Sequence, residues 1–235
     1  MSGRGDWKKI ATALIAFVVV LGGWWLFQQE RERRLAHAPL PGEGGTQGLC
    51  ALWVIGSSSV HRWTSVERDL SPWIAHNRGI EGATFAQLGP RFASETETRA
   101  PEAMILYAGE NDIAAGGSAR QAIADLEAFL ADKTAKFGQT PVFVVSMKPS
   151  PTRWKFLAEQ GRFNRAAAAI GRQRADVTFV DIVPLLLDKG RPGNFYQADG
   201  IHMNALGYGL WAAAIRDALR RYLPSGVVQH CDPGR

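Results

Sequence analysis

The sequence predicts an α/β domain, in which helices cover both faces of a parallel sheet, and three observations lead to this fold class. From Leu49 onward, short apolar runs alternate with longer amphipathic segments, and strands that alternate with helices form parallel sheets through right-handed crossovers. The short runs are apolar throughout rather than at every second position, which is typical of strands buried on both faces. A chain of 235 residues with 46% apolar side chains is long enough for one such domain and additional segments.

Residues 10–27, with the sequence IATALIAFVVVLGGWWLF, carry no charge and are predicted to be a transmembrane helix. At about 1.5 Å per residue this segment spans about 27 Å, close to the ~30 Å of a bilayer's hydrocarbon core. Trp24 and Trp25 fit the interface at its end. A cleaved signal peptide is the alternative, because AHA at 36–38 resembles a cleavage site. The long apolar run and the charges at 30–34 favour an uncleaved anchor.

The anchor divides the chain into further segments with distinct compositions. We predict a short N-terminal tail (1–9), the anchor (10–27), a linker rich in Pro and Gly (28–48), a hydrolase domain (49–223) and a C-terminal tail (224–235).

The orientation of the anchor is not decided by charge, because arginines and lysines flank it on both sides. Cys50 and Cys231 lie at the two ends of the domain and are either a disulfide or two separate thiols. A disulfide would need an oxidising compartment. Together these features favour a single-pass membrane protein whose domain lies outside the cytoplasm, on the periplasmic side.

Within the domain, the apolar runs predict strands and the amphipathic segments predict helices. The strands are LWVI (52–55), WIAHN (73–77, at an edge), EAMILYA (102–108), PVFVVSM (141–147) and VTFVDI (177–182), and the helices are 118–137, 153–173 and 205–223.

The charge of the chain argues against nucleic-acid binding. The 27 Lys and Arg exceed the 22 Asp and Glu by only +5, and they are spread along the chain apart from RERR at 31–34. Nucleic-acid-binding proteins need a clustered basic face or a recognisable module, and the sequence contains neither.

Polar and glycine-rich blocks follow the predicted strands, at the edge where open α/β sheets carry their sites. These blocks are Gly56–Ser59, NRGIEGAT (77–84, with Gly82), Gly109–Asp112 and DGIHMN (199–204). Each block alone is a weak signal, but the four in this order are informative.

From Leu49 to Leu223 the sequence resembles the SGNH (GDSL-type) hydrolase family, a family of serine esterases. The resemblance rests on Gly56-Ser57-Ser58, Gly82, Gly109-x-Asn111-Asp112 and Asp199-x-x-His202. It implies a three-layer α/β/α flavodoxin-like fold and ester hydrolysis through a Ser-His-Asp triad, with no cofactor and no metal. Ser57 stands where the family name has Asp.

The resemblance also assigns roles to individual residues. Ser58 is the expected nucleophile, His202 its base and Asp199 the acid that orients the imidazole. The expected oxyanion hole consists of the backbone N–H groups of Ser58 and Gly82 and the side-chain amide of Asn111.

Other residues near these blocks have less specific interpretations. Ser59 is expected to begin the next helix, and Asp112 to cap the loop after the third strand rather than to act directly. A metal site formed by Glu110, Asp112 and His202 is conceivable, but no ligand spacing supports it.

We therefore predict a membrane-anchored serine esterase for small acyl esters, acetyl above all, with a small molecule or a carbohydrate as the alcohol part. The alternatives are an O-acyltransferase that uses the same triad with a sugar acceptor, and a non-catalytic binding module. The filled catalytic positions weigh against the binding module. Trp63 and the segment KPSPTRW (148–154) either contact substrate or pack the fold.

Overall fold

The computed structural model describes residues 17, 20–27, 30, 38–42 and 48–233. The chain divides into two compact units, Met1–Ala38 and Pro39–Arg235. In the first unit, residues 20–27 are helical and exposed. No helix in the described part of the chain is long and apolar enough to cross a membrane. Half of the predicted anchor, residues 10–16, 18 and 19, lies outside the described residues. The structure therefore gives it no support, and it stays a prediction.

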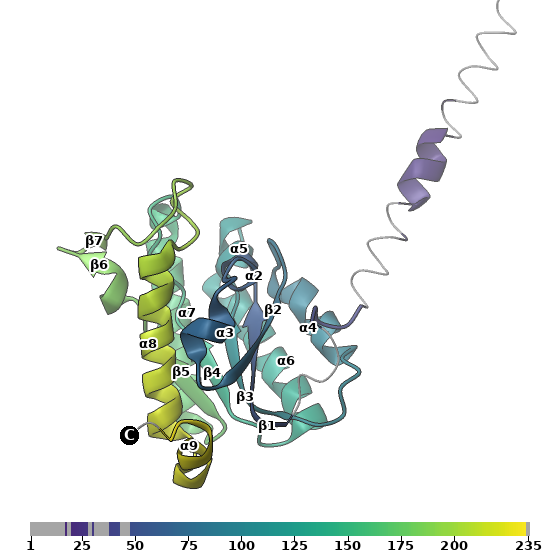
Figure 1. Ribbon diagram of the computed structural model, residues 1–235. Helices are drawn as coiled ribbons and strands as arrows, with labels where there is room; N and C mark the ends of the chain where they lie inside the picture. The colour runs from purple at the N-terminus through teal and green to yellow at the C-terminus, as the bar shows by residue number, and fades with distance from the viewer. Residues whose placement is uncertain (1–16, 18–19, 28–29, 31–37, 43–47, 234–235) are drawn as a thin grey trace, which may run out of the picture. The chain divides into compact units, whose positions relative to one another are not determined.

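The second unit is built on a five-stranded parallel sheet with the strand order β2-β1-β3-β4-β5 (Figure 1). This is the strand order of flavodoxin-like folds. Each strand overlaps a predicted one, and β2 lies at an edge as predicted. The strands are β1 (Gly48–Gly56), β2 (Ile74–Gly79), β3 (Pro101–Tyr107), β4 (Val142–Val145) and β5 (Val177–Val180).

Helices cover both faces of the sheet and complete the predicted three layers (Figure 1). One face carries α2 (Ser58–His61), α3 (Val66–Leu70) and α8 (Ala205–Tyr222), and the other carries α4 (Phe85–Ala93), α6 (Ala119–Phe137) and α7 (Leu157–Gln173). The remaining elements are α5 (Glu110–Ala114), η1 (Trp154–Phe156), η2 (Pro184–Leu186), β6 (Leu187–Asp188), β7 (Arg191–Pro192) and α9 (Ser225–Cys231).

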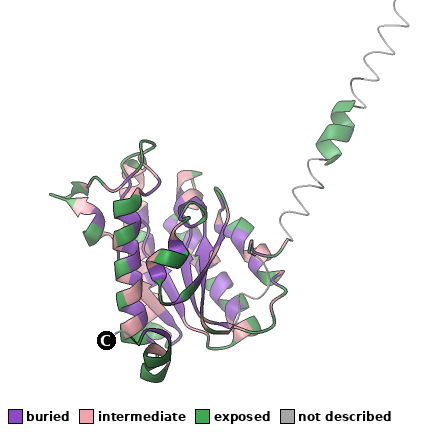
Figure 2. Cartoon of the chain, viewed as in Figure 1, coloured by how far each residue is buried: buried purple, intermediate pink, exposed green. Residues whose placement is uncertain are grey.

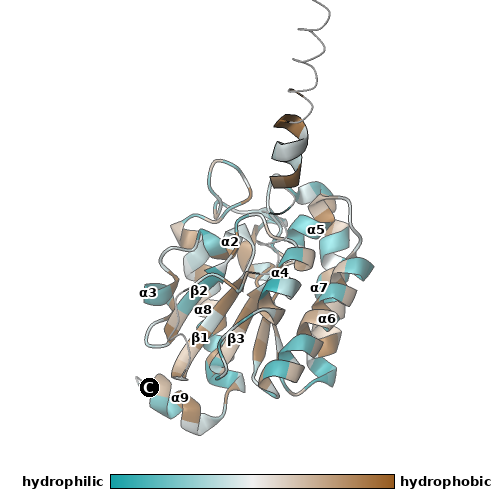
Figure 3. Cartoon of the chain, turned by 90° about the vertical axis from the view of Figure 1, so that its right-hand side faces the viewer, coloured by the Kyte–Doolittle hydropathy of each residue, from teal (hydrophilic) through white to brown (hydrophobic). Residues whose placement is uncertain are grey.

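The core explains why the strands are apolar at every position. Leu52 and Val54 of β1 pack under α8, while Trp53 and Ile55 pack on the opposite side under α4 and α6. Figure 2 shows the central strands buried, and Figure 3 shows the sheet more apolar than the exposed helix faces around it. A strand between two helical layers has no solvent face and so needs no polar alternation.

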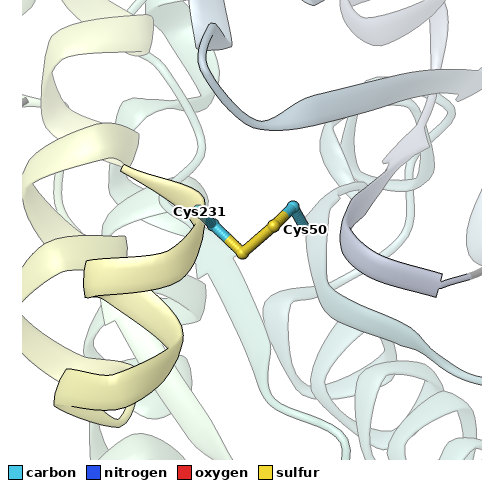
Figure 4. Close-up of a disulfide and its surroundings, with 2 residues drawn as sticks. All are labelled: Cys50 and Cys231. Carbon is cyan, nitrogen blue, oxygen red and sulfur yellow. A yellow bond between two sulfur atoms is a disulfide. The ribbon is translucent and has the colours of Figure 1, made fainter. Parts of the chain in front are cut away.

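Both ends of the domain differ from the segments predicted there. The predicted C-terminal tail contains α9, and a disulfide joins Cys231 to Cys50 at the start of the domain, with their Cα atoms 5.3 Å apart (Figure 4). Of the two alternatives for these cysteines, the structure has the bridge.

The predicted linker also contributes to the domain. Leu40 is only 2% exposed and belongs to the core, and Arg78 Nε donates to the carbonyl of Pro41 at 3.1 Å. The compact unit therefore begins at Pro39, before the first strand.

Candidate active site

The block after β1 places Ser58 at the carboxyl edge of the sheet. Gly56 lies so close to β3 that a Cβ atom there would come within 2.3 Å of the Tyr107 carbonyl oxygen. The next amide, Ser57 N–H, donates to that same oxygen at 3.2 Å. Helix α2 then begins at Ser58, with Ser57 as its N-cap, one residue earlier than the expected start at Ser59. The turn thus fixes Ser58 directly beyond the strand.

Ser58, His202 and Asp199 form a continuous chain of hydrogen bonds. His202 Nε2 lies 2.9 Å from Ser58 Oγ, and His202 Nδ1 lies 2.6 Å from Asp199 Oδ2. Ser58 and His202 are 6% and 7% exposed, so this pair is largely shielded from water. The arrangement allows the imidazole to receive a proton from the serine hydroxyl while the carboxylate holds its other nitrogen.

Asp199 is held by the backbone that follows it. Its Oδ1 accepts hydrogen bonds from the amides of Ile201 and His202, at 2.8 and 2.9 Å. Burial acts to raise the pKa of Asp199, but the hydrogen bonds from the His202 side chain and from these two amides outweigh it and lower the pKa to about 2. The carboxylate is therefore ionised in the range where esters are hydrolysed enzymatically.

A cation lies beside the acid end of this chain. Arg62 Nη1 is 3.1 Å from His202 Nδ1 and 3.7 Å from Asp199 Oδ2. Because Nδ1 carries the proton that it donates to Asp199, it cannot also accept one from Arg62, which has only donors. Arg62 therefore acts on the carboxylate through its charge. Its position is fixed by Glu81, which binds it through two nitrogens at 2.6 and 3.1 Å.

Gly82 and Asn111 meet beside the block that carries Ser58. Gly82 has a φ of +68°, which explains the glycine, since a Cβ there would meet no atom within 4 Å. Asn111 Nδ2 donates to the carbonyl of Ala83 at 2.9 Å, which ties α5 to the loop after β2. The amides of Ser58 and Gly82 have no acceptor among the described residues, and Asn111 Nδ2 retains a second N–H.

Asp112 is a cap, but for a more distant element than expected. Its carboxylate accepts from the amide of Phe85, the first residue of α4, at 3.1 and 3.3 Å. Asp112 therefore fixes the loop after β2 at the end where α4 begins. Glu110 points elsewhere, toward Lys148, and the described residues contain no group of three or more side chains suited to a metal ion.

Beneath the site lies a buried charge network that the sequence analysis did not identify. Glu110 and Lys148 are 2% and 0% exposed at the side chain and pair at 2.5 Å, and Tyr107 donates its hydroxyl to the same carboxylate. Burial acts to raise the pKa of Glu110, but Lys148 and Arg153 lower it overall, so the carboxylate stays charged. Lys148 also donates to Ser59 Oγ at 3.0 Å. The sequence signal for it was too weak to use, since Lys148 and Arg153 follow a buried strand as site residues do, but a charged residue at such a place is usually solvated.

The aromatic residues near the site divide into two kinds. Trp63 is fully buried and stacks on Tyr208, with ring centroids 5.3 Å apart, so it packs the core and cannot contact a substrate. Trp154 is only half-buried, and Arg191 lies over its ring at 5.5 Å. Of the two, Trp154 remains available to a ligand.

The sequence from residue 45 to residue 210 matches the GDSL-like Lipase/Acylhydrolase family. The chain belongs to this family. Family membership agrees with the fold and identifies the protein as a carboxylic ester hydrolase, as the strand-end blocks predicted. No curated protein sequence matches the chain.

Solved structures with the same fold extend over most of the chain. A protein of Streptococcus pneumonia that was proposed to be a platelet activating factor has 23% identity and a TM-score of 0.67, over 87% of this chain and 99% of its own. A GDSL-like lipase from Bacteroides thetaiotaomicron has 19% identity and a TM-score of 0.61, over 82% and 97%. A carbohydrate esterase of family 3 from Talaromyces cellulolyticus has 17% identity and a TM-score of 0.60, over 73% and 97%.

Proposed function

We propose that this hydrolase cleaves small acyl esters, acetyl esters above all, with Ser58 as nucleophile, His202 as general base and Asp199 as the orienting acid. The observation that carries the proposal is the hydrogen-bond chain from Ser58 Oγ through both ring nitrogens of His202 to Asp199. A serine is a weak nucleophile until an adjacent base removes its proton, and that base must be held in one tautomer.

The reaction then runs in two halves. His202 Nε2 takes the proton of Ser58 as Oγ attacks the ester carbonyl, and returns it to the departing alcohol, which leaves an acyl group on Ser58. A water molecule, deprotonated by the same nitrogen, attacks the acyl carbonyl. The bond from the acyl carbon to Ser58 Oγ then breaks, His202 returns the proton to Oγ, and the free acid leaves. In both halves Asp199 stabilises the imidazolium that forms.

The negative charge on the carbonyl oxygen needs donors that are already in place. The amides of Ser58 and Gly82 and the Asn111 Nδ2–H are proposed to supply them. Their support is that each has an N–H without an acceptor among the described residues. Such donors stabilise the transition state more than the bound ester.

For the alcohol part we propose a carbohydrate. The support is limited to two points. A carbohydrate esterase and an acetyl esterase share the fold, and Trp154 presents a half-buried ring beside the segment that contacts Asp199. Sugar rings commonly stack on such aromatic faces.

We further propose that residues 10–27 anchor the enzyme in a membrane, with the domain outside the cytoplasm. The uncharged run of 18 residues supports the anchor, and the Cys50–Cys231 disulfide supports an oxidising compartment. In this arrangement the enzyme would act on esters of the cell envelope.

Substitution of each serine in the block tests the catalytic assignment. In Ser58→Ala, kcat for p-nitrophenyl acetate should fall by about 10⁴–10⁶ with the fold intact. Ser57→Ala and Ser59→Ala are matched controls and should lose far less. A Ser58→Ala protein that keeps most of its activity while Ser57→Ala is inactive would refute the assignment. Release of p-nitrophenol from acetyl, butyryl and octanoyl esters, with and without a sugar acceptor, would define acyl length and reveal any transfer.

Fractionation tests the anchor separately. The full chain should stay with membranes after high-salt and carbonate washes, because a spanning helix is not extracted by them. A chain that begins at Pro39 should be soluble and active, since the compact unit and the buried Leu40 are retained. Full-length protein released by carbonate, or with a mature N-terminus near Pro39, would contradict the proposal.

A further inference from the structure

The side chain of Asn111 lies between two polar neighbours, and each of them is compatible with only one orientation of its amide. Arg153 Nη2 donates to Asn111 Oδ1 at 2.7 Å, and the carbonyl of Ala83 accepts from Nδ2 at 2.9 Å. A guanidinium has donors and no acceptor, and a carbonyl has acceptors and no donor. Either neighbour alone would therefore set the oxygen toward Arg153 and the nitrogen toward the loop that follows Gly82.

Arg153 is itself held by the buried charge network. Its Nη1 lies 3.3 Å from Glu110 Oε1, while Lys148 binds the other oxygen of that carboxylate at 2.5 Å. The Arg153 side chain is 16% exposed, so most of it is fixed by protein contacts. Arginine loses much side-chain entropy when it is ordered, and the buried carboxylate offsets this loss before any substrate binds.

The network extends to the residue after the proposed nucleophile. Lys148 Nζ donates to Ser59 Oγ at 3.0 Å, and Ser59 follows Ser58 in α2. A continuous path of polar contacts thus runs from the buried Ser59, Lys148 and Glu110 to the partly buried Arg153 and Asn111. It connects the element that carries the nucleophile with the element that carries the side-chain oxyanion donor.

We propose that Arg153 is a positioning residue for ester hydrolysis, which holds the Asn111 amide with one N–H directed at the carbonyl oxygen of the reacting ester. The proposal rests on the proposed role of Asn111 in the oxyanion hole. Arg153 also polarises the amide, because a charged donor on Oδ1 makes the opposite N–H a stronger donor. The Ala83 carbonyl still orients the amide when Arg153 is absent, so the loss of Arg153 should cost less than the loss of Asn111.

A double-mutant cycle in the full chain tests whether Arg153 acts through Asn111. Arg153→Met keeps an unbranched chain as far as the position of Nε and removes the hydrogen-bonding end of the guanidinium. It should lower kcat for p-nitrophenyl acetate about tenfold, about 1.4 kcal/mol, and leave KM nearly unchanged. In an Asn111→Ala background the same substitution should change kcat little, because the group that it positions is gone. Arg191→Met is the matched control, since it removes the same charge next to Trp154 without contacting Asn111, and it should keep kcat.

Each alternative result has a distinct meaning. If the losses of kcat in Arg153→Met and Asn111→Ala multiply in full in the double variant, Arg153 does not act through Asn111 and the proposal is wrong. If Arg153→Met raises KM alone, Arg153 acts on substrate binding and the proposal is also wrong. If Asn111→Ala lowers kcat while Arg153→Met does not, the oxyanion role survives and only the positioning role fails. An Asn111→Ala enzyme with unchanged kcat would remove the oxyanion role and this proposal together. Should Arg153→Met not fold, Arg153→Lys replaces it in the cycle, since one ammonium group cannot repeat the two-nitrogen contact with Glu110 and Asn111.

Discussion

Two buried clusters with the same chemical composition lie at opposite edges of the sheet. At the carboxyl edge, Glu110 is paired with Lys148 and Arg153. At the amino edge, Asp176 precedes β5 and is paired with Lys133 and Arg174, at 2.5 and 2.7 Å. The lysine side chain is 0% exposed in both clusters, and each carboxylate is shared by a lysine and an arginine.

The clusters differ in the further residue that the arginine of each cluster binds. Arg174 bonds to Asp176 and to Thr134 of α6, and Lys133 also donates to the Gly138 carbonyl, so this cluster joins α6 to β5 and ends there. Arg153 instead continues to Asn111. The composition of a buried ion cluster therefore does not reveal its role. The group at its end does, and on this basis one cluster stabilises the fold and the other also serves the site.

The largest effect should come from breaking the amino-edge cluster. Asp176→Asn leaves the buried Lys133 ammonium without its counter-ion and should lower the free energy of unfolding by about 3–5 kcal/mol. The kcat of the remaining folded enzyme should be unchanged, because the cluster lies at the opposite edge from Ser58. Urea unfolding and p-nitrophenyl acetate kinetics measure the two quantities. Asp132→Asn, a substitution on the exposed surface of α6, serves as the control.

The opposite pattern is expected at the carboxyl edge. Asn111→Ala removes the proposed oxyanion donor, which would act on charge that develops only in the transition state, so kcat should fall by about 10²–10³, or about 3–4 kcal/mol. The free energy of unfolding should change much less, since the half-buried Asn111 loses one bond to Ala83 and one to Arg153. A change in KM alone would make Asn111 a substrate-binding residue and would weaken the contrast between the two edges.

The contrast also explains what the sequence could predict. Strands were predictable because their apolar runs reflect burial on both faces, and the blocks that contain Ser58, Asn111 and His202 were predictable because the chain order places them at one sheet edge. Lys148 and Arg153 were not, because a charged residue after a strand is usually solvated. Their burial depends on Glu110, which lies on a different element and pairs with them only after folding.

The chain ends were hard to predict for a related reason. Leu40 and the residues of α9 belong to short segments without clear periodicity, and their order comes from contacts with Arg78 and from the Cys50–Cys231 bridge. Tertiary contacts and not local propensity determine such segments.

The disulfide tests, with a smaller expected effect, whether stability and activity depend on opposite edges of the sheet. Cys50 and Cys231 are separated by 181 residues, and removal of the bridge in Cys50→Ala/Cys231→Ala should lower the free energy of unfolding by about 2–4 kcal/mol. The kcat should be retained, because the bridge joins the start of β1 to α9, away from the carboxyl edge. Loss of activity in the folded double variant would show that the bridge also supports the site. Mass analysis under non-reducing conditions checks that the wild-type protein is oxidised.

The smallest effect concerns acid pH, to which carboxylates at both edges should contribute. Hydrogen bonds from Arg174 lower the pKa of Asp176 below its usual 3.8, against the effect of burial, and Lys133 lowers it further. A carboxyl group whose pKa is lowered by folding stabilises the protein above its unfolded pKa, and this contribution is lost as the pH falls toward the folded pKa. The wild-type protein should therefore lose stability as the pH is lowered below about 4, and Asp176→Asn should lose less over the same range. At the carboxyl edge, Glu110 and Asp199 contribute with the same sign. Against the effect of burial, Lys148 and Arg153 lower the pKa of Glu110, and the pKa of Asp199 is about 2. The Asp199 side chain is 38% exposed, so solvent screening should make its share small. The contributions of Asp176 and Asp199 are measured as the free energy of unfolding in urea at about pH 6 and about pH 3. The proteins compared are wild type, Asp176→Asn and Asp199→Asn. A larger reduction of the acid-dependent loss in Asp199→Asn than in Asp176→Asn would mean that Asp199, and not Asp176, makes the larger contribution to acid stability.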